Sequence, residues 1–221
     1  GPGSGKLATC LSQVYHDHQQ GIQSGYAKFE TFPIWNLPLM HPVNVAYEAA
    51  TADLQDVNLI DPFHLEACEE TAINYNRDVE AFPVLHKILE RITGDEPIYR
   101  SPTEMGVNRA STGIVDDAAV QAAACAEVIR RYFRYRSEYA MGHADERTVQ
   151  RVERLMEVLR IKPEDRNVVE PARQAAETAR QQGKGNDGVF CGAAIELGDG
   201  REVTGSNSPR MHAASALVIN A

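Results

Sequence analysis

The sequence lacks long apolar runs, closely spaced cysteines and an excess of positive charge, and each lack excludes a class of protein. No apolar run approaches the roughly 20 residues that a membrane-spanning helix requires. The four cysteines form no C-x-x-C pair, which argues against a zinc ribbon or a disulfide framework and indicates buried thiols in a reducing cytoplasm. The net charge of −9 argues against a general nucleic-acid surface, although an acidic protein can hold a local basic pocket for a small anion.

The composition is sufficient for a folded core. The chain has 221 residues, of which 43% are hydrophobic and 24% charged, as expected of one large domain or two small ones. We therefore expect a cytoplasmic protein with no membrane or nucleic-acid partner.

The first six residues read Gly-Pro-Gly-Ser-Gly-Lys and lead directly into a helical pattern. Such a loop can point backbone N–H groups, a helix N-terminus and a lysine at one phosphate. The candidate phosphate ligands are Gly3, Ser4, Gly5, Lys6 and Thr9, with Thr9 or Ser4 as the hydroxyl for a magnesium ion.

The match to the full Walker motif is partial, because that motif needs a glycine before Gly1 and a hydroxyl residue after Lys6, where Leu7 stands. The first four letters are also typical of a cleaved expression tag. Since a loop of this kind normally follows a buried strand, we expect the chain to be an internal fragment of a longer protein.

Hydrophobic periodicity and capping residues predict a mostly helical middle part, with two irregular, proline- or glycine-rich stretches at residues 26–42 and 95–114. The predicted helices cover residues 5–23, 43–54, 63–70, 75–82, 83–93, 116–140, 145–161 and 163–182.

The pattern changes at the glycine-rich segment 183–188, which we predict as a domain boundary. Residues 189–197 and 201–204 read as two strands joined by the turn 198–200, and residues 211–220 read as a helix.

Several segments together resemble one bacterial family, the uncharacterised protein family 0371, also catalogued as domain of unknown function 1846. They are residues 1–10 (GPGSGKLATC), 25–39 (GYAKFETFPIWNLPL), 41–57 (HPVNVAYEAATADLQDV), 60–66 (IDPFHLE), 75–79 (YNRDV) and 101–108 (SPTEMGVN). Members are about twice as long as this chain. The resemblance implies that the glycine-rich start is native sequence. It also implies an architecture, but no established activity.

The last segment is also similar to the opening of cytidine-deaminase folds, in which a hairpin leads to a helix with a zinc ligand and, two residues on, a catalytic glutamate. His212 would stand at the ligand position, but Ala214 stands where the glutamate belongs. Without that acid no group relays the proton, so we keep the fold similarity alone and assign no metal ligand.

Four polar residues of the middle part are candidate catalytic or orienting groups: His41, Asp61, His64 and Arg77. The first three lie at predicted helix starts beside prolines, where capping or packing is the alternative role. Arg77 could clamp a phosphate or, together with neighbouring asparagines, tie helices together. A further basic group, Arg130, Arg131, Arg134 and Arg136, alternates with acids and reads as a solvated or subunit-facing surface.

The overall prediction is an α/β protein in three parts. Residues 1–24 form a P-loop-like or Rossmann-like loop and helix, residues 25–182 a mainly helical domain, and residues 183–221 the start of a cytidine-deaminase-like α/β subdomain. We expect binding of a phosphorylated small molecule, with ATP or another nucleotide and magnesium as the cofactor class, in a homo-oligomer. The alternative is a non-catalytic ligand-sensing or scaffolding oligomer.

Overall fold

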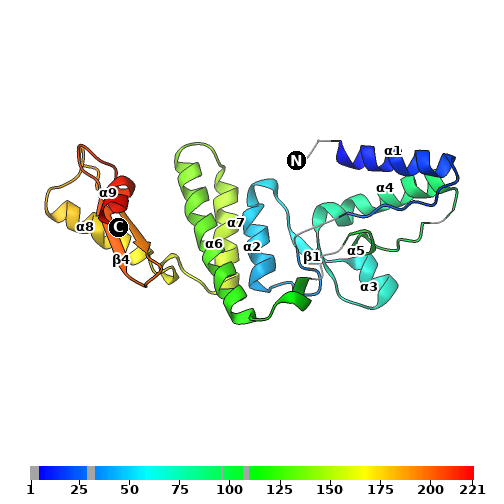
Figure 1. The fold of residues 1–221 in the computed structure, drawn as a ribbon, viewed down its shortest axis with the longest axis horizontal. Helices are drawn as coiled ribbons and strands as arrows, with labels where there is room; N and C mark the ends of the chain where they lie inside the picture. Colours follow the sequence, from blue (N-terminus) through cyan, green and yellow to red (C-terminus); the bar gives the residue numbers. More distant parts are fainter. Residues whose placement is uncertain (1–4, 29–32, 96, 107–109) are drawn as a thin grey trace. The chain divides into compact units, whose positions relative to one another are not determined.

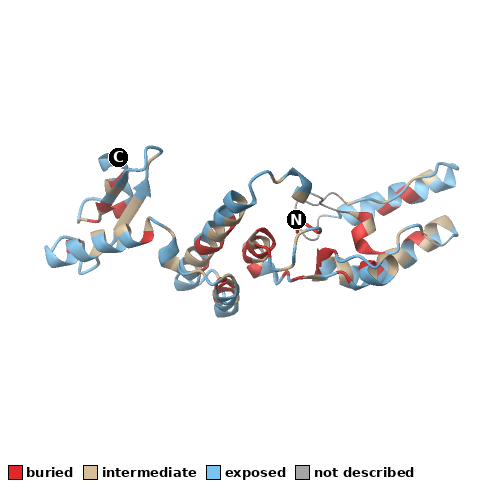
Figure 2. Ribbon diagram, turned by 90° about the horizontal axis from the view of Figure 1, so that it is seen from below, coloured by how far each residue is buried: buried red, intermediate tan, exposed pale blue. Residues whose placement is uncertain are grey.

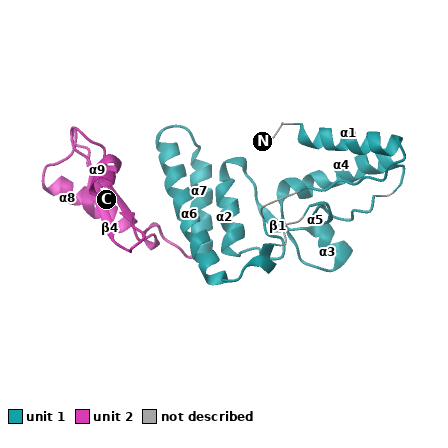
Figure 3. Ribbon diagram, in the orientation of Figure 1, with its two compact units in different colours: residues 1–159 teal, residues 160–221 magenta. Residues whose placement is uncertain are grey.

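A computed structural model of the chain describes residues 5–28, 33–95, 97–106 and 110–221. It divides into two compact units, Gly1–Leu159 and Arg160–Ala221 (Figure 3). The predictions for Gly3 and Ser4 lie outside the described residues. Residues 160–182, which the sequence analysis grouped with the helical domain, lie in the second unit with the predicted hairpin.

Unit 1 is mostly helical and carries one small sheet (Figure 1). Its elements are α1 (Lys6–Gln19), α2 (Pro42–Ala50), the 3₁₀ turn η1 (Ala52–Leu54), β1 (Asn58–Ile60), α3 (Pro62–Cys68), β2 (Ile73–Tyr75), α4 (Asn76–Thr93), α5 (Pro102–Met105), η2 (Ala110–Gly113), α6 (Asp117–Ala140) and α7 (Glu146–Leu159).

Helices α2, α6 and α7 pack side by side as one layer of unit 1 (Figure 1). Their apolar residues recur at helical spacing, so each helix presents one stripe to its neighbours. Val128 and Ile129 of α6 and Val152 of α7 are almost completely buried in this layer, and Figure 2 shows the buried residues of these helices in red.

A second core lies where α1 packs on α4. Leu11 and Val14 of α1 meet Phe82 and Leu89 of α4 there, together with Met105 of α5. Helix α4 continues through Pro83, where the sequence analysis also expected helical character. The aromatic side chains packed around this core explain why the helix persists despite the lost hydrogen bond.

The strands β1 and β2 pair antiparallel, with Leu59 opposite Asn74. The sequence analysis missed both strands, because three residues are too few to show an alternating pattern. Residues 70–75 also lead straight into α4, so the helical pattern of α4 hides the end of β2.

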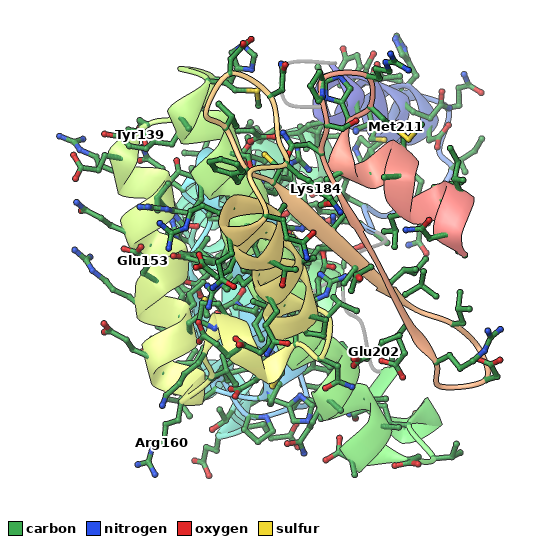
Figure 4. The ribbon with its side chains drawn as sticks, turned by 90° about the vertical axis from the view of Figure 1, so that its left-hand side faces the viewer. Tyr139, Glu153, Arg160, Lys184, Glu202 and Met211 are labelled. Atoms are coloured by element: carbon green, nitrogen blue, oxygen red, sulfur yellow. The ribbon has the colours of Figure 1, made fainter. Side chains whose placement is uncertain are left out.

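Unit 2 consists of η3 (Pro163–Asp165), α8 (Val169–Gln181), β3 (Gly192–Glu196), β4 (Glu202–Ser206) and α9 (Ala213–Asn220). The strands pair antiparallel as predicted, with Ala193 opposite Gly205, although β3 is shorter than the predicted strand and β4 extends two residues further. Figure 4 shows α8 and α9 on opposite sides of this hairpin, with Glu202 near its turn and Met211 near the beginning of α9.

The fold class is therefore mixed helix and sheet, in agreement with the α/β prediction at that level. Among the described residues, no helix is long and apolar enough to cross a membrane. The expectation of buried thiols is wrong for two cysteines, since Cys10 and Cys191 are exposed, and Cys68 and Cys125 are only partly buried.

Glycine permits the close packing of the helices on the hairpin. A Cβ atom on Gly205 would lie 2.7 Å from the carbonyl oxygen of Ala213 and closer still to the amide nitrogen of Leu217, both backbone atoms of α9. On the neighbouring strand, Gly192 approaches the backbone of α8 at Ala172 in the same way.

We predict that Gly205→Ala destabilises unit 2 by about 1–3 kcal/mol, because α9 must move away from β4. Hydrogen exchange should then be faster at the amides of β3 and β4. Gly198→Ala is the matched control, since no atom lies within 4 Å of a Cβ at that turn position. Equal exchange in the two variants would contradict the packing role of Gly205.

Candidate functional site

Helix α1 begins at Lys6, and Gly5 before it has the left-handed backbone that favours glycine, with φ 78°. Among the described residues, no side chain caps this helix start, and its first turn contains no acidic residue. The Lys6 side chain is exposed. The Thr9 hydroxyl donates to the Gly5 carbonyl at 3.1 Å, which uses its hydrogen and leaves its oxygen lone pairs available.

His41 joins two helices. It precedes α2, where its Nδ1 accepts from the backbone N–H of Val43 at 3.3 Å. That bond assigns the ring hydrogen to Nε2, which lies 3.0 Å from a carboxylate oxygen of Asp117 at the beginning of α6. The pKa of Asp117 is lowered by the hydrogen bond from Gln121 and by this one. The His41 side chain is buried, whereas that of Asp117 is 52% exposed. The pair links α2 to α6.

Asp61 is fully buried, and its carboxylate accepts four hydrogen bonds. One oxygen caps α3 by accepting from the amides of Phe63 and His64 at 3.0 and 3.1 Å. The other accepts from the amide and the hydroxyl of Thr103 in α5, at 3.2 and 2.5 Å. This geometry gives Asp61 a structural role, because every acceptor position of the carboxylate is occupied.

His64 lies one turn into α3 and is also buried. Its Nδ1 is 3.0 Å from the hydroxyl oxygen of Ser101, which caps α5, and its ring meets Trp35 edge to face. Its Nε2 is buried and has no hydrogen-bond partner within the described part of the chain. The Nε2 atom of His64 is therefore available for a further hydrogen bond, whereas both carboxylate oxygens of Asp61 are already bonded.

Arg77 binds a carboxylate of the protein itself. Its Nε and Nη2 lie 2.7 and 2.8 Å from the two oxygens of Asp56, a residue that is almost completely buried. Burial lowers the pKa of Arg77, but the bond to Asp56 outweighs it and leaves the pKa raised. The ion pair ties the beginning of α4 to the segment before β1, which is the tying role considered for this residue.

A cluster beside Arg77 was missed by sequence reasoning. Lys28 donates to both carboxylate oxygens of Asp78 at 2.7 Å and to the hydroxyl of Tyr75, whose ring it also overlies at 4.7 Å. The Arg77 guanidinium stands 5.4 Å from the centre of the same ring. Lys28 lies about 50 residues before its partners, so no local sequence pattern could predict the contact.

The structure thus brings Asp61 and His64 together at α3, with Arg77 nearby in sequence but bonded elsewhere. It places His41 on α2, bonded to α6, and Lys6 and Thr9 on α1. No hydrogen bond between described residues joins the α1 start to any of the four candidate catalytic groups. Groups of three or more histidine, cysteine or acidic side chains able to hold a metal are absent from the described residues.

Three of the four arginines in the basic group on α6 are paired with acids of the same helix. Glu127 accepts from Arg130 and Arg131 at 2.6 Å, and Arg134 donates to Glu138 at 2.7 Å. This confirms the alternating charge pattern as a helix surface held by local ion pairs.

Comparison with known proteins gives the family. The model described as "Domain of unknown function DUF1846, N-terminal" matches residues 1–160, and its C-terminal counterpart matches residues 164–221. The chain belongs to this family. The two matches follow the two compact units closely.

The relatives carry the second family name. A "UPF0371 protein" of Clostridium tetani (strain Massachusetts / E88) is 53% identical over all of this chain, and the same holds for a "UPF0371 protein" of Clostridium botulinum (strain Langeland / NCTC 10281 / Type F). The chain spans about 44% of the length of these relatives. Their greater length fits the expectation of an internal fragment.

We predict that Asp61→Asn lowers the free energy of unfolding by about 2–3 kcal/mol, because the amide nitrogen cannot accept the hydrogen bonds that one carboxylate oxygen now receives. Asp116→Asn is the matched control: Asp116 caps α6 at an exposed position, where asparagine caps equally well, so its effect should stay below about 0.5 kcal/mol. Chemical denaturation measures both. Similar values for the two variants would remove the structural role of Asp61.

The pKa of Glu127 is lowered from 4.5 to about 2, chiefly by the hydrogen bond from Arg130. A carboxylate whose pKa falls on folding stabilises the fold above its ordinary pKa and loses that contribution as the pH falls towards the lowered value. We predict that Glu127→Gln costs about 1 kcal/mol near neutral pH, after allowance for solvent screening at this partly exposed site. The difference from wild type should vanish between pH 4.5 and about 2. Denaturation across that range tests the prediction, and a difference independent of pH would refute it.

Proposed function

We propose that this chain binds a nucleotide or another phosphorylated small molecule at the glycine-rich start of α1. The observation that carries the proposal is the beginning of α1, which no side chain of the described residues caps, with Lys6 exposed beside it. The first N–H groups of a helix have no partner within the helix, and the helix dipole favours an anion there. A phosphate would accept from these groups and pair with the lysine.

Other helix starts of unit 1 support this choice by contrast. Helices α2, α3, α5 and α6 each begin at a side chain that accepts from their first amides, and α4 has an acidic residue in its first turn. Helix α9 of unit 2 also lacks both features, but it has neither a glycine-rich approach nor a lysine at its start. Among these helices, α1 combines an open N-terminus with a cation.

Thr9 is proposed as an additional ligand, through the lone pairs that its bond to Gly5 leaves available. Among the predicted reacting or orienting groups, His64 is favoured by its unbonded Nε2, whereas Asp61 and Arg77 already have protein partners.

The alternative, a non-catalytic ligand-sensing or scaffolding oligomer, is favoured by one observation on α4. Val84 and Ile88, one turn apart on this helix, expose 64% and 38% of their surface. Exposed apolar residues on one helix face are typical of a contact with another protein surface.

A thermal-shift screen of the full-length protein against nucleotides and phosphorylated metabolites tests the proposal. A ligand at 100 times its dissociation constant stabilises the folded state by about 2.7 kcal/mol, which raises the melting temperature by several degrees. We predict that Lys6→Ala abolishes this rise for at least one phosphorylated ligand. Lys184→Ala, which removes the same charge from an exposed position of unit 2, should leave it unchanged. If wild type and Lys6→Ala respond equally to every ligand, the phosphate proposal fails and the scaffold becomes the better account.

A further inference from the structure

Unit 1 contains a pocket that no prediction from the sequence had placed. It lies between α7 and the segment that connects α2 to β1, and its volume is about 670 Å³. Sites for small molecules usually have volumes between about 300 and 1,000 Å³. Its lining includes three arginines of α7, namely Arg147, Arg151 and Arg154, together with Glu48 and Gln55.

The middle arginine is held by the protein. Arg151 donates to a carboxylate oxygen of Glu48 at 3.0 Å and to the backbone carbonyl of Asp56. The second oxygen of Glu48 accepts from the amide of Asn58 at 3.2 Å. Both members of the ion pair are largely buried, with 19% and 16% of their side chains exposed. The pair therefore forms a fixed, locally neutral floor of the pocket.

The outer two arginines are different. Arg147 and Arg154 are exposed and form no ion pair with the described residues. They lie four residues before and three residues after Arg151, so all three side chains are on one face of α7. By contrast, Arg130 on α6 and Arg180 on α8 each bind a glutamate three residues earlier on the same helix. Like charges at this spacing on a helix repel one another, and Glu48 offsets the charge of Arg151 alone.

The acid at the beginning of α7 is bonded mainly to the helix itself. Asp145 accepts from the amide and the hydroxyl of Thr148 at 2.7 and 2.8 Å, and these bonds lower its pKa, with a smaller contribution from the charge of Arg147. Its carboxylate is thus directed at the helix start. Three arginines against two lining carboxylates leave the pocket with an excess positive charge, in a chain whose net charge is −9.

The remaining lining sets the shape of a ligand. Ala52, Val57 and Leu155 provide apolar surface. Gln55 offers an amide from a left-handed backbone with φ 60°, a conformation that non-glycine residues adopt rarely and mostly at turns and functional sites. Seven residues of an α-helix advance about 10 Å, so the two outer arginines begin about 10 Å apart.

We propose that this pocket binds a small molecule with an anionic group, phosphate or carboxylate, at each end and a partly apolar body between them. Arg147 and Arg154 each bind one anionic group, and the Arg151–Glu48 pair fixes the floor between them. This site is separate from the start of α1 and does not depend on the function proposed there.

The test uses full-length protein that carries Lys6→Ala, so that any phosphate site at α1 is removed from every measurement. Inorganic tripolyphosphate, citrate and orthophosphate are titrated by calorimetry. We expect tripolyphosphate or citrate to bind more tightly than orthophosphate, and the tighter of the two identifies phosphates or carboxylates as the preferred groups. Arg147→Ala and Arg154→Ala should each weaken this binding at least about tenfold, the usual effect of a lost charge-assisted hydrogen bond.

Arg136→Ala is the matched control, because Arg136 is exposed on α6 outside the pocket and its loss changes the net charge equally. Binding should be retained in this variant, and the melting temperature should stay unchanged in all three, since none of these arginines forms an ion pair with described residues. Three results would overturn the proposal: no binding of either polyanion, equal binding of polyanions and orthophosphate, or an equal loss of affinity in all three arginine variants.

Discussion

The need to satisfy buried polar groups determines how the segments of unit 1 are held together. Asp61 shows it most clearly, because its fully buried carboxylate receives two bonds from α3 and two from Thr103, 42 residues further along the chain. A buried carboxylate without such partners would cost far more than one hydrogen bond contributes. The short helix α5 is therefore fixed against α3 by polar contacts as well as by the apolar core.

The same constraint holds residues 34–38, which lie before α2. Asn44, which is fully buried, accepts from the amide of Ile34 at 2.8 Å and donates to the carbonyls of Ile34 and Pro38. The backbone carbonyl of Asn44 accepts from the side-chain amide of Asn58 at 2.7 Å, which connects the beginning of α2 to β1. Trp35 of this stretch is also buried, but it is Asn44 that provides hydrogen-bond partners for the backbone of Ile34 and Pro38.

Local signals predicted local structure well. Asp116 caps α6, and Asp61-Pro62 and His41-Pro42 supply the cap and the first residue of α3 and α2, because capping and the fixed backbone of proline act within a few residues. The hairpin of unit 2 was likewise visible from its turn. The pairing of charges was not: Asp56 with Arg77, Glu48 with Arg151 and Asp78 with Lys28 join residues 21, 103 and 50 positions apart. Such pairs follow from the tertiary arrangement, and no spacing in one sequence encodes them.

These distant pairs also show why the sequence alone could not tell which cations are already paired within the protein. Arg77 looked suited to binding an external anion. A buried carboxylate without a counter-charge is costly, however, and Arg77 forms the ion pair with the buried carboxylate of Asp56. In an acidic chain, a cation left without a carboxylate partner at a concave or helix-start position is the more informative feature. Within the described residues, Lys6 at the start of α1 and the two outer arginines of α7 meet that condition, and all three lie in unit 1. Arg151 is bonded to Glu48 and to the backbone carbonyl of Asp56, in the segment before β1. The side chain of Asp56 is bonded in turn to Arg77 of α4. A ligand that binds beside Arg151 would therefore contact residues that are connected to α4.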